Sequence, residues 1–350
     1  MNRALVDHIA NALMYEGYNL YPYRPSLKNH KRWTFGGLFP EAYCPSANGD
    51  AASLQTEFLI QGDAWTTFEA VVRFLHLSDR ITGEIDPPLV AWPSGAEPEF
   101  RPVPVLQVGA RRLHSWQEGE EREVSLGRLP LKKLLRRPRS VRFAFPGVRR
   151  LEPVRDEDRK IVAVKVQEQK AIAGSIEARA IEVGEGLFRM TLRVINCTPL
   201  NNSVAMSRDA ALLHSLISTH VLLGVQDGAF VSLLDPPHHW REEAAACRNV
   251  GVWPVLVGAE EQTDTMLASP IILYDYPQVA PESPGEFFDG TEIDEMLTLR
   301  ILTMTDEEKR DMAAVDERTR ALLERTESLA RQQMLGLHGT MRRPKEEVDG

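Results

Sequence analysis

The alternation of apolar and polar residues is the clearest pattern in the chain, and it begins near residue 55. Phe68, Ala70, Val72 and Phe74 share one face of an extended segment, while the residues between them face the other way. A period of two is typical of a β-strand, because successive side chains point to opposite faces. The same reasoning predicts further strands at residues 103–109, 121–126 and 140–145. We therefore expect a β-rich body over residues 51–258.

Two pairs of predicted strands are separated by tight-turn residues. Residues 176–183 and 187–195 flank Gly184-Glu185-Gly186. Residues 221–225 and 229–234 flank Asp227-Gly228, a dipeptide favoured in two-residue hairpins. Both pairs are predicted to be antiparallel hairpins. They favour a mostly antiparallel system, either a sandwich or a strongly bent sheet, over a doubly wound nucleotide-binding fold.

The N-terminal 50 residues differ from this body. Residues 3–14 carry apolar side chains at helical spacing and predict a short amphipathic helix. A stretch rich in aromatic residues and prolines follows, and prolines exclude a regular helix there. We expect residues 1–50 to form a helix and an ordered aromatic arm.

The C-terminal third carries explicit helix signals. Thr291 with Asp294 and Thr305 with Glu308 have the spacing of a capping box, in which a hydroxyl and an acid satisfy the first backbone donors of a helix. Residues 259–335 are predicted to form an acidic loop and helices, and residues 336–350 a disordered tail. The predicted fold class is therefore α+β, with a mostly antiparallel β-rich body and a helical C-terminal third.

Charge and cysteine content restrict the classes of binding partner and the cellular compartment that we expect for this protein. The formal net charge is −9 and the pI about 5.6, which argues against a protein whose whole surface attracts nucleic acid or anionic lipid. The three cysteines are far apart in the sequence, as in a reduced intracellular protein. Neither a secretory signal nor an apolar stretch long enough to span a bilayer is evident, so a cytoplasmic location is expected.

Acidic residues are concentrated near the C-terminus. Residues 259–308 hold thirteen acids and one base, Arg300. Several of these acids fit a solvated or helix-capping role, and a metal or partner site is the alternative. Because aromatic, acidic and turn residues mix tightly here and in the N-terminal arm, both segments are candidates for partner binding. The candidate residues are Tyr21, Tyr23, Arg24, Tyr274, Asp275, Tyr276, Glu282, Asp289 and Glu292.

A run of bases without acids spans residues 128–150. Few aromatic residues accompany it, so nucleic-acid recognition is a minor alternative to docking on an acidic protein or to a solvated face. The predicted basic patch consists of Lys132, Lys133, Arg136, Arg137 and Arg139.

Residues that could hold a metal lie in the sequence between the basic run at residues 128–150 and the acidic segment at residues 259–308. His238, His239 and Cys247 are zinc-ligand types, but their spacing fits no zinc template, and an exposed loop followed by a short helix is the simpler interpretation. No phosphate-binding loop, nucleophile elbow or paired-cysteine motif is present, so no catalytic residue and no cofactor are predicted.

Several short segments of the sequence resemble segments found in a known group of proteins. They lie at residues 15–18, 21–24, 234–237, 253–258, 269–277 and 288–295. The chain there resembles uncharacterised bacterial proteins encoded beside uptake nickel–iron hydrogenases. The resemblance implies maturation, assembly or accessory support of a hydrogenase, and it supplies no catalytic residues. The chain lacks the histidine-rich tract and paired cysteines of nickel-delivery accessories.

Together these features predict a non-catalytic accessory protein with a protein partner, such as hydrogenase subunits or maturation factors, and they leave homo-oligomerisation open. A metal-dependent enzyme is the alternative.

Overall fold

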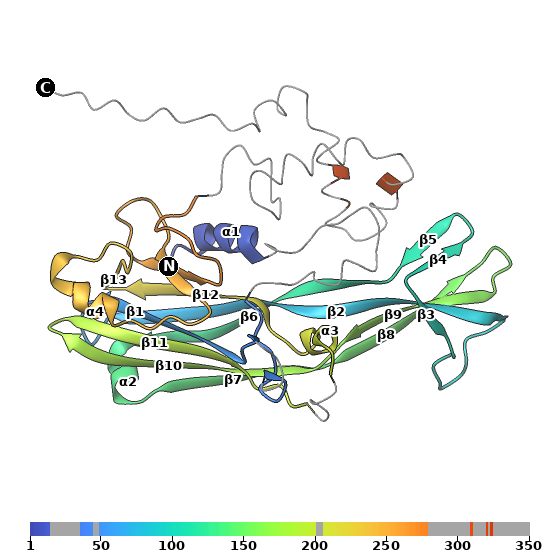
Figure 1. The fold of residues 1–350 in the computed structure, drawn as a ribbon, viewed down its shortest axis with the longest axis horizontal. Coiled ribbons are helices and arrows are strands. Elements are labelled where there is room, and N and C mark those ends of the chain that lie inside the picture. Colours follow the sequence, from blue (N-terminus) through green and yellow to red (C-terminus); the bar gives the residue numbers. More distant parts are fainter. Residues whose placement is uncertain are drawn as a thin grey trace, which may run out of the picture.

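The computed structural model describes residues 1–14, 36–44, 49–200 and 206–278, together with Lys309, Arg310, Arg320, Leu323 and Glu324. Two antiparallel sheets dominate this part of the chain and pack face to face as a sandwich (Figure 1).

The smaller sheet has five strands in the order β13-β1-β11-β10-β7. Their bounds are Ala229–Val231 for β13, Ser53–Gln61 for β1, Leu187–Asn196 for β11, Ile172–Gly184 for β10 and Arg139–Phe145 for β7. Every pairing is antiparallel, and β10 and β11 form the predicted hairpin. Strand β7 therefore lies at one edge of this sheet.

The larger sheet is organised around one long strand, β2, which spans Thr67–Leu89. The sheet follows the order β14-β15-β12-β2-β9-β8, and β3 and β6 also pair with β2. The other strands are β3 (Arg101–Val103), β6 (Trp116–Pro130), β8 (Val148–Arg155), β9 (Ile161–Gln169), β12 (Ile217–Gln226), β14 (Trp253–Leu256) and β15 (Thr265–Ser269). Because β2 pairs first with β12 and then with β9 along one edge, it links the sandwich to a thinner distal end.

The main core lies between the inner faces of the two sheets. Phe58 of β1 contacts Phe68 of β2 and Phe230 of β13, with ring centroids 5.8 and 5.6 Å apart. Strands of both sheets contribute alternate residues to this core, as the period of two requires. The inward set on β2 is the one seen in the sequence: Phe68, Ala70, Val72 and Phe74.

The distal end carries a separate two-stranded hairpin and its own apolar cluster. Strand β4 (Val105–Val108) pairs with β5 (Arg111–His114), and the hairpin lies beside β2, β8 and β9 (Figure 1). Ile85, Ile161, Val164 and Val166 form the cluster that holds this end together.

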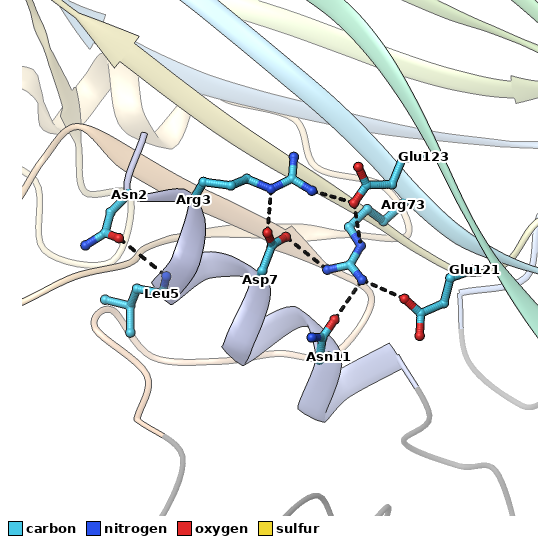
Figure 2. A network of polar contacts seen from close by, with 8 residues as sticks. All are labelled: Asn2, Arg3, Leu5, Asp7, Asn11, Arg73, Glu121 and Glu123. Atoms are coloured by element: carbon cyan, nitrogen blue, oxygen red, sulfur yellow. Dashed lines mark hydrogen bonds and ion pairs between the residues drawn. The ribbon is translucent and has the colours of Figure 1, made fainter. Parts of the chain in front are cut away.

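Helix α1 (Arg3–Met14) covers the outer face of the larger sheet. Val6, Ile9 and Ala10 are buried against Leu222 of β12 and Leu267 of β15. A polar network fixes the same helix at its side, where the buried Arg73 of β2 meets Asp7 and Asn11 of α1 and Glu121 and Glu123 of β6 (Figure 2). The predicted helix at residues 3–14 is thus confirmed.

The predicted α+β class with a helical C-terminal third is wrong. The described chain is mostly antiparallel sheet, and its four α-helices are short and scattered: α1, α2 (Leu131–Arg136), α3 (Arg208–Leu212) and α4 (Arg241–Ala245). Strand pairing prevails because the alternating segments bury one face each, whereas a capping signal acts only on one turn. The predicted helices that begin at Thr291 and Thr305 lie almost wholly outside the described residues.

The second predicted hairpin is also wrong. Strand β12 belongs to the larger sheet, whereas β13 pairs with β1 in the smaller one. The turn at Asp227-Gly228 therefore carries the chain across the sandwich instead of back along one sheet. Thr66, in the turn between β1 and β2, donates a 2.7 Å hydrogen bond from Oγ1 to the carbonyl of Asp227, so the two crossing turns support each other.

None of the helices in the described ranges is long and apolar enough to cross a membrane.

Candidate functional site: a basic edge of the sandwich

The basic run of the sequence forms the connection between the two sheets. It starts at the end of β6 in the larger sheet, passes through helix α2 and continues as β7 in the smaller sheet. Leu131 and Leu134 of α2 are buried in the inter-sheet core. Because these two residues define the inner face of a six-residue helix, Lys133 and Arg136 point outward.

Strand β7 presents side chains to both faces of the smaller sheet at its edge. Val141, Phe143 and Phe145 face inward and are only partly buried against the core. Arg139 points to the same face of the sheet as these three residues. Arg142 points to the opposite face and is paired in register with Ser175 of β10. The strand edge is therefore flanked by an arginine on each face of the sheet.

Five exposed bases of α2, of the residue that follows it and of β7 have no ion pair and no side-chain hydrogen bond within the described residues. We call them the basic edge, and they are Lys133, Arg136, Arg137, Arg139 and Arg142. They sit at one end of the sandwich and along its β7 edge (Figure 1).

Other bases of the same run are neutralised within the chain. Arg128 pairs with Glu69 at 3.2 Å, and Arg149 pairs with Glu97 at 2.9 Å and with Glu168 at 2.7 Å. Lys132 places its ammonium 4.2 Å from the ring centroid of Trp65, so it differs from the rest of the predicted patch. The structure thus divides the run into paired bases and a basic edge.

An aromatic cluster lies behind the edge strand. The Phe143 ring is 5.8 Å from that of Phe74 and 6.1 Å from that of Phe145. The Arg122 guanidinium of β6 lies 4.8 Å from the Phe145 centroid. This packing gives the edge a rigid apolar backing in addition to its charge.

The partner-binding candidates of the acidic loop separate into different roles. Tyr274 is 87% exposed and available for contact. Asp275 instead accepts hydrogen bonds from Ser232 Oγ at 2.5 Å and from the Leu256 backbone N–H at 2.7 Å. Tyr276 packs against the inter-sheet core, and burial raises the pKa of its phenol. Asp275 and Tyr276 therefore fasten the loop to the body.

The remaining partner-binding candidates lie outside the described residues. These are Tyr21, Tyr23, Arg24, Glu282, Asp289 and Glu292.

The metal-ligand candidates lie on one surface segment without converging. His238 and His239 belong to the exposed one-turn 3-10 helix His238–Trp240, and the His239 ring contacts the Trp240 ring. Cys247 follows α4 and packs against an apolar cluster, and burial together with the nearby Glu57 carboxylate raises its thiol pKa to about 12. Within the described ranges no three His, Cys, Asp or Glu side chains are grouped to hold a metal. The metal hypothesis stays a prediction.

The predicted basic patch did not include Arg142, which is exposed on β7 beside the other bases. The signal was available, because Arg142 alternates with Val141 and Phe143 in a predicted strand. The acids that neutralise Arg128 and Arg149 lie 19 to 59 positions away in the sequence. No local sequence pattern predicts these ion pairs.

No protein-family model matches this chain, and no curated protein is significantly similar to it.

Proposed function

We propose that this protein is a non-catalytic accessory protein that holds an acidic segment of a protein partner against the basic edge. The observation that supports this most is that five neighbouring bases have no acidic counterpart among the described residues, in a chain with a net charge of −9. A partner that supplies carboxylates would complete these pairs. Complementary charge sets specificity and encounter rate more than affinity.

Strand addition is the mode of binding that fits the geometry. One side of β7 pairs with β10 without a bulge, and no strand pairs with its other side within the described residues. Seven residues of extended strand offer an edge roughly 23 Å long. An added strand would gain main-chain hydrogen bonds, and its alternate acids would meet Arg139 on one face and Arg142 on the other.

The alternative is that the arginines only protect the edge, because charged side chains commonly keep edge strands from pairing. Two features favour docking. Strand β7 is regular, and Val141, Phe143 and Phe145 remain partly exposed behind it, so an added strand would bury more of them. Protection alone requires neither feature.

The cellular setting rests on the resemblance to proteins encoded beside uptake nickel–iron hydrogenases. We take the partner to be a hydrogenase subunit or maturation factor in the cytoplasm. Tyr274 is a candidate second contact, since it is exposed while its neighbour Asp275 is engaged in the body.

Photocrosslinking tests the proposal directly. A photoreactive amino acid replaces the exposed Ser140 or Ala144 of β7 in the native host, and the crosslinked peptides are sequenced by mass spectrometry. We expect an acid-rich segment of a hydrogenase subunit or maturation factor. The triple variant Arg136→Glu, Arg139→Glu, Arg142→Glu should reduce crosslinking more than tenfold, and raised salt should weaken it.

The matched control is Arg179→Glu with Arg193→Glu, which reverses two exposed bases on the outer face of the same sheet. Crosslinking that falls equally in both variants, or that persists in the triple variant, contradicts the basic edge as the binding site. Crosslinks only to nucleic acid would replace the proposal with the nucleic-acid alternative, and crosslinks only to a second copy would make the edge a self-association site.

The enzyme alternative has a separate test. Elemental analysis of the purified protein should find less than about a tenth of an equivalent of any transition metal if no tight centre exists. A stoichiometric metal lost in a Cys247→Ser variant would favour the metal-dependent enzyme.

A further inference from the structure

A pocket of about 480 Å³ is lined by strands at the distal end of the larger sheet. In Figure 1 these strands lie away from helix α2. Its floor is one face of strands β8, β9, β2 and β6, and β5 of the β4–β5 hairpin forms a wall. The volume is within the range of small-molecule sites.

The floor is built from a row of residues in register across four strands. Arg150 of β8 is opposite Gln167 of β9, Gln167 is opposite Arg80 of β2, and Arg80 is opposite Trp116 of β6. The next row on the same face contains Glu152, Lys165 and Thr82. Sheet register therefore fixes these polar side chains next to one another on a rigid surface.

Bases outnumber acids among the described residues that line this pocket. These are Arg80, Arg112, Arg150 and Lys165, with a single acid, Glu152. Glu118 neutralises Arg80, since its Oε1 accepts hydrogen bonds of 2.8 and 2.5 Å from that guanidinium. No ion pair or side-chain hydrogen bond joins Arg150 or Lys165 to another described residue. An excess of positive charge thus faces a concave surface in a chain that is acidic overall.

Trp116 adds an unsatisfied donor to the pocket wall. Its indole Nε1–H is buried and has no hydrogen-bond partner within the described residues. A buried donor without an acceptor destabilises the folded chain, because it has lost its hydrogen bond to water. A ligand oxygen that reached this N–H would satisfy it.

We infer that this pocket binds a small organic anion through a phosphate or carboxylate group. Arg150 and Lys165 supply the charge, and Gln167 and Trp116 supply neutral donors. The site is separate from the basic edge, which begins at α2 at the far end of the sandwich and continues along β7 of the smaller sheet (Figure 1).

Titration of the indole signals tests this inference. The tryptophans are labelled with nitrogen-15, the Trp116 signal is assigned from a Trp116→Phe variant, and inorganic phosphate or citrate is added at constant ionic strength. We expect a saturable shift of the Trp116 signal below about 10 mM, a range that detects even millimolar affinity. Phosphate and citrate together distinguish a phosphate site from a carboxylate site.

Variants of the lining residues show whether the anion binds in this pocket. Arg150→Gln with Lys165→Met should raise the dissociation constant at least tenfold. The control Arg193→Gln, which removes an exposed base from β11, should leave it within twofold. Folding of each variant is checked by the unchanged positions of the other indole signals. No shift with either anion, an equal affinity in the double variant, or an equal loss in the control overturns the inference.

Discussion

Arg73 lies buried beneath helix α1, and its Nη1 donates a 3.1 Å hydrogen bond to Oδ1 of Asp7. The same guanidinium donates from Nη2 to Asn11 at 2.7 Å and to Glu121 at 2.9 Å, and its Nε lies 3.2 Å from Glu123 (Figure 2). One arginine of the long strand β2 therefore joins the N-terminal helix to strand β6.

Removing the arginine should cost more stability than removing one acid. Arg73→Ala leaves Glu121 without its cation and leaves only Arg3 beside Asp7 and Glu123, so we expect the free energy of unfolding to fall by about 3 kcal/mol. Asp7→Ala leaves Glu121 and Glu123 in place and should cost about 1 kcal/mol. Urea unfolding measures both, with Arg179→Ala as an exposed control. Equal losses for Arg73→Ala and Asp7→Ala would mean that the helix contact alone carries the energy.

Two buried histidines should make the protein sensitive to acid. Burial lowers the pKa of His76 and of His220 to about 4, although each ring also donates one hydrogen bond to a backbone carbonyl. The unfolded chain has a histidine pKa near 6.5, so it binds more protons than the folded chain between these values. Stability is present above pH 6.5 and is lost as the pH falls toward 4, by about 3 kcal/mol for each histidine.

The pH dependence of urea unfolding between pH 7 and 4 checks this expectation. His220→Gln should reduce the slope of stability against pH by about one proton. His238→Gln, at an exposed position, should leave the slope unchanged. A slope that neither His220→Gln nor His76→Gln alters would show that carboxyl groups account for the acid sensitivity.

Tyr274 and Asp275 are neighbours with opposite expected phenotypes. Tyr274→Ala removes an exposed ring and should change the free energy of unfolding by less than about 0.5 kcal/mol. Asp275→Ala leaves Ser232 and the Leu256 N–H without their acceptor and should cost about 2 kcal/mol. Thermal unfolding distinguishes the two. A stable Asp275→Ala variant with impaired partner binding would restore Asp275 as a binding residue.

Cys247 should resist alkylation in the folded protein. Its thiol pKa of about 12 leaves about a thousandfold less thiolate near neutral pH than the ordinary value of 9 allows. Cys197 is exposed and should react first with iodoacetamide. Mass spectrometry of a labelling time course gives the order, and Cys197→Ser should abolish the fast phase. Rapid labelling of Cys247 would contradict the burial and revive its role as a thiolate ligand.

Local patterns predicted the elements better than their partners. The alternation in residues 68–77 marked β2, and the Gly184-Glu185-Gly186 turn marked the β10–β11 hairpin. The Asp227-Gly228 turn predicted a hairpin on the same grounds, yet the chain crosses there to the other sheet. A turn dipeptide fixes the backbone over a few residues, whereas sheet membership depends on which distant strand offers an apolar face.

The sequence by itself determined the strand periodicity, helix α1 and the basic, acid-free segment at residues 128–150, because each depends on neighbours along the chain. Only the tertiary structure decided which of those bases remain unpaired, since Glu69, Glu97 and Glu168 reach Arg128 and Arg149 from other strands. The row Arg150, Gln167, Arg80 and Trp116 likewise exists only through register. Coulomb attraction and hydrogen bonding act over a few ångströms in space, and the fold sets which residues come that close.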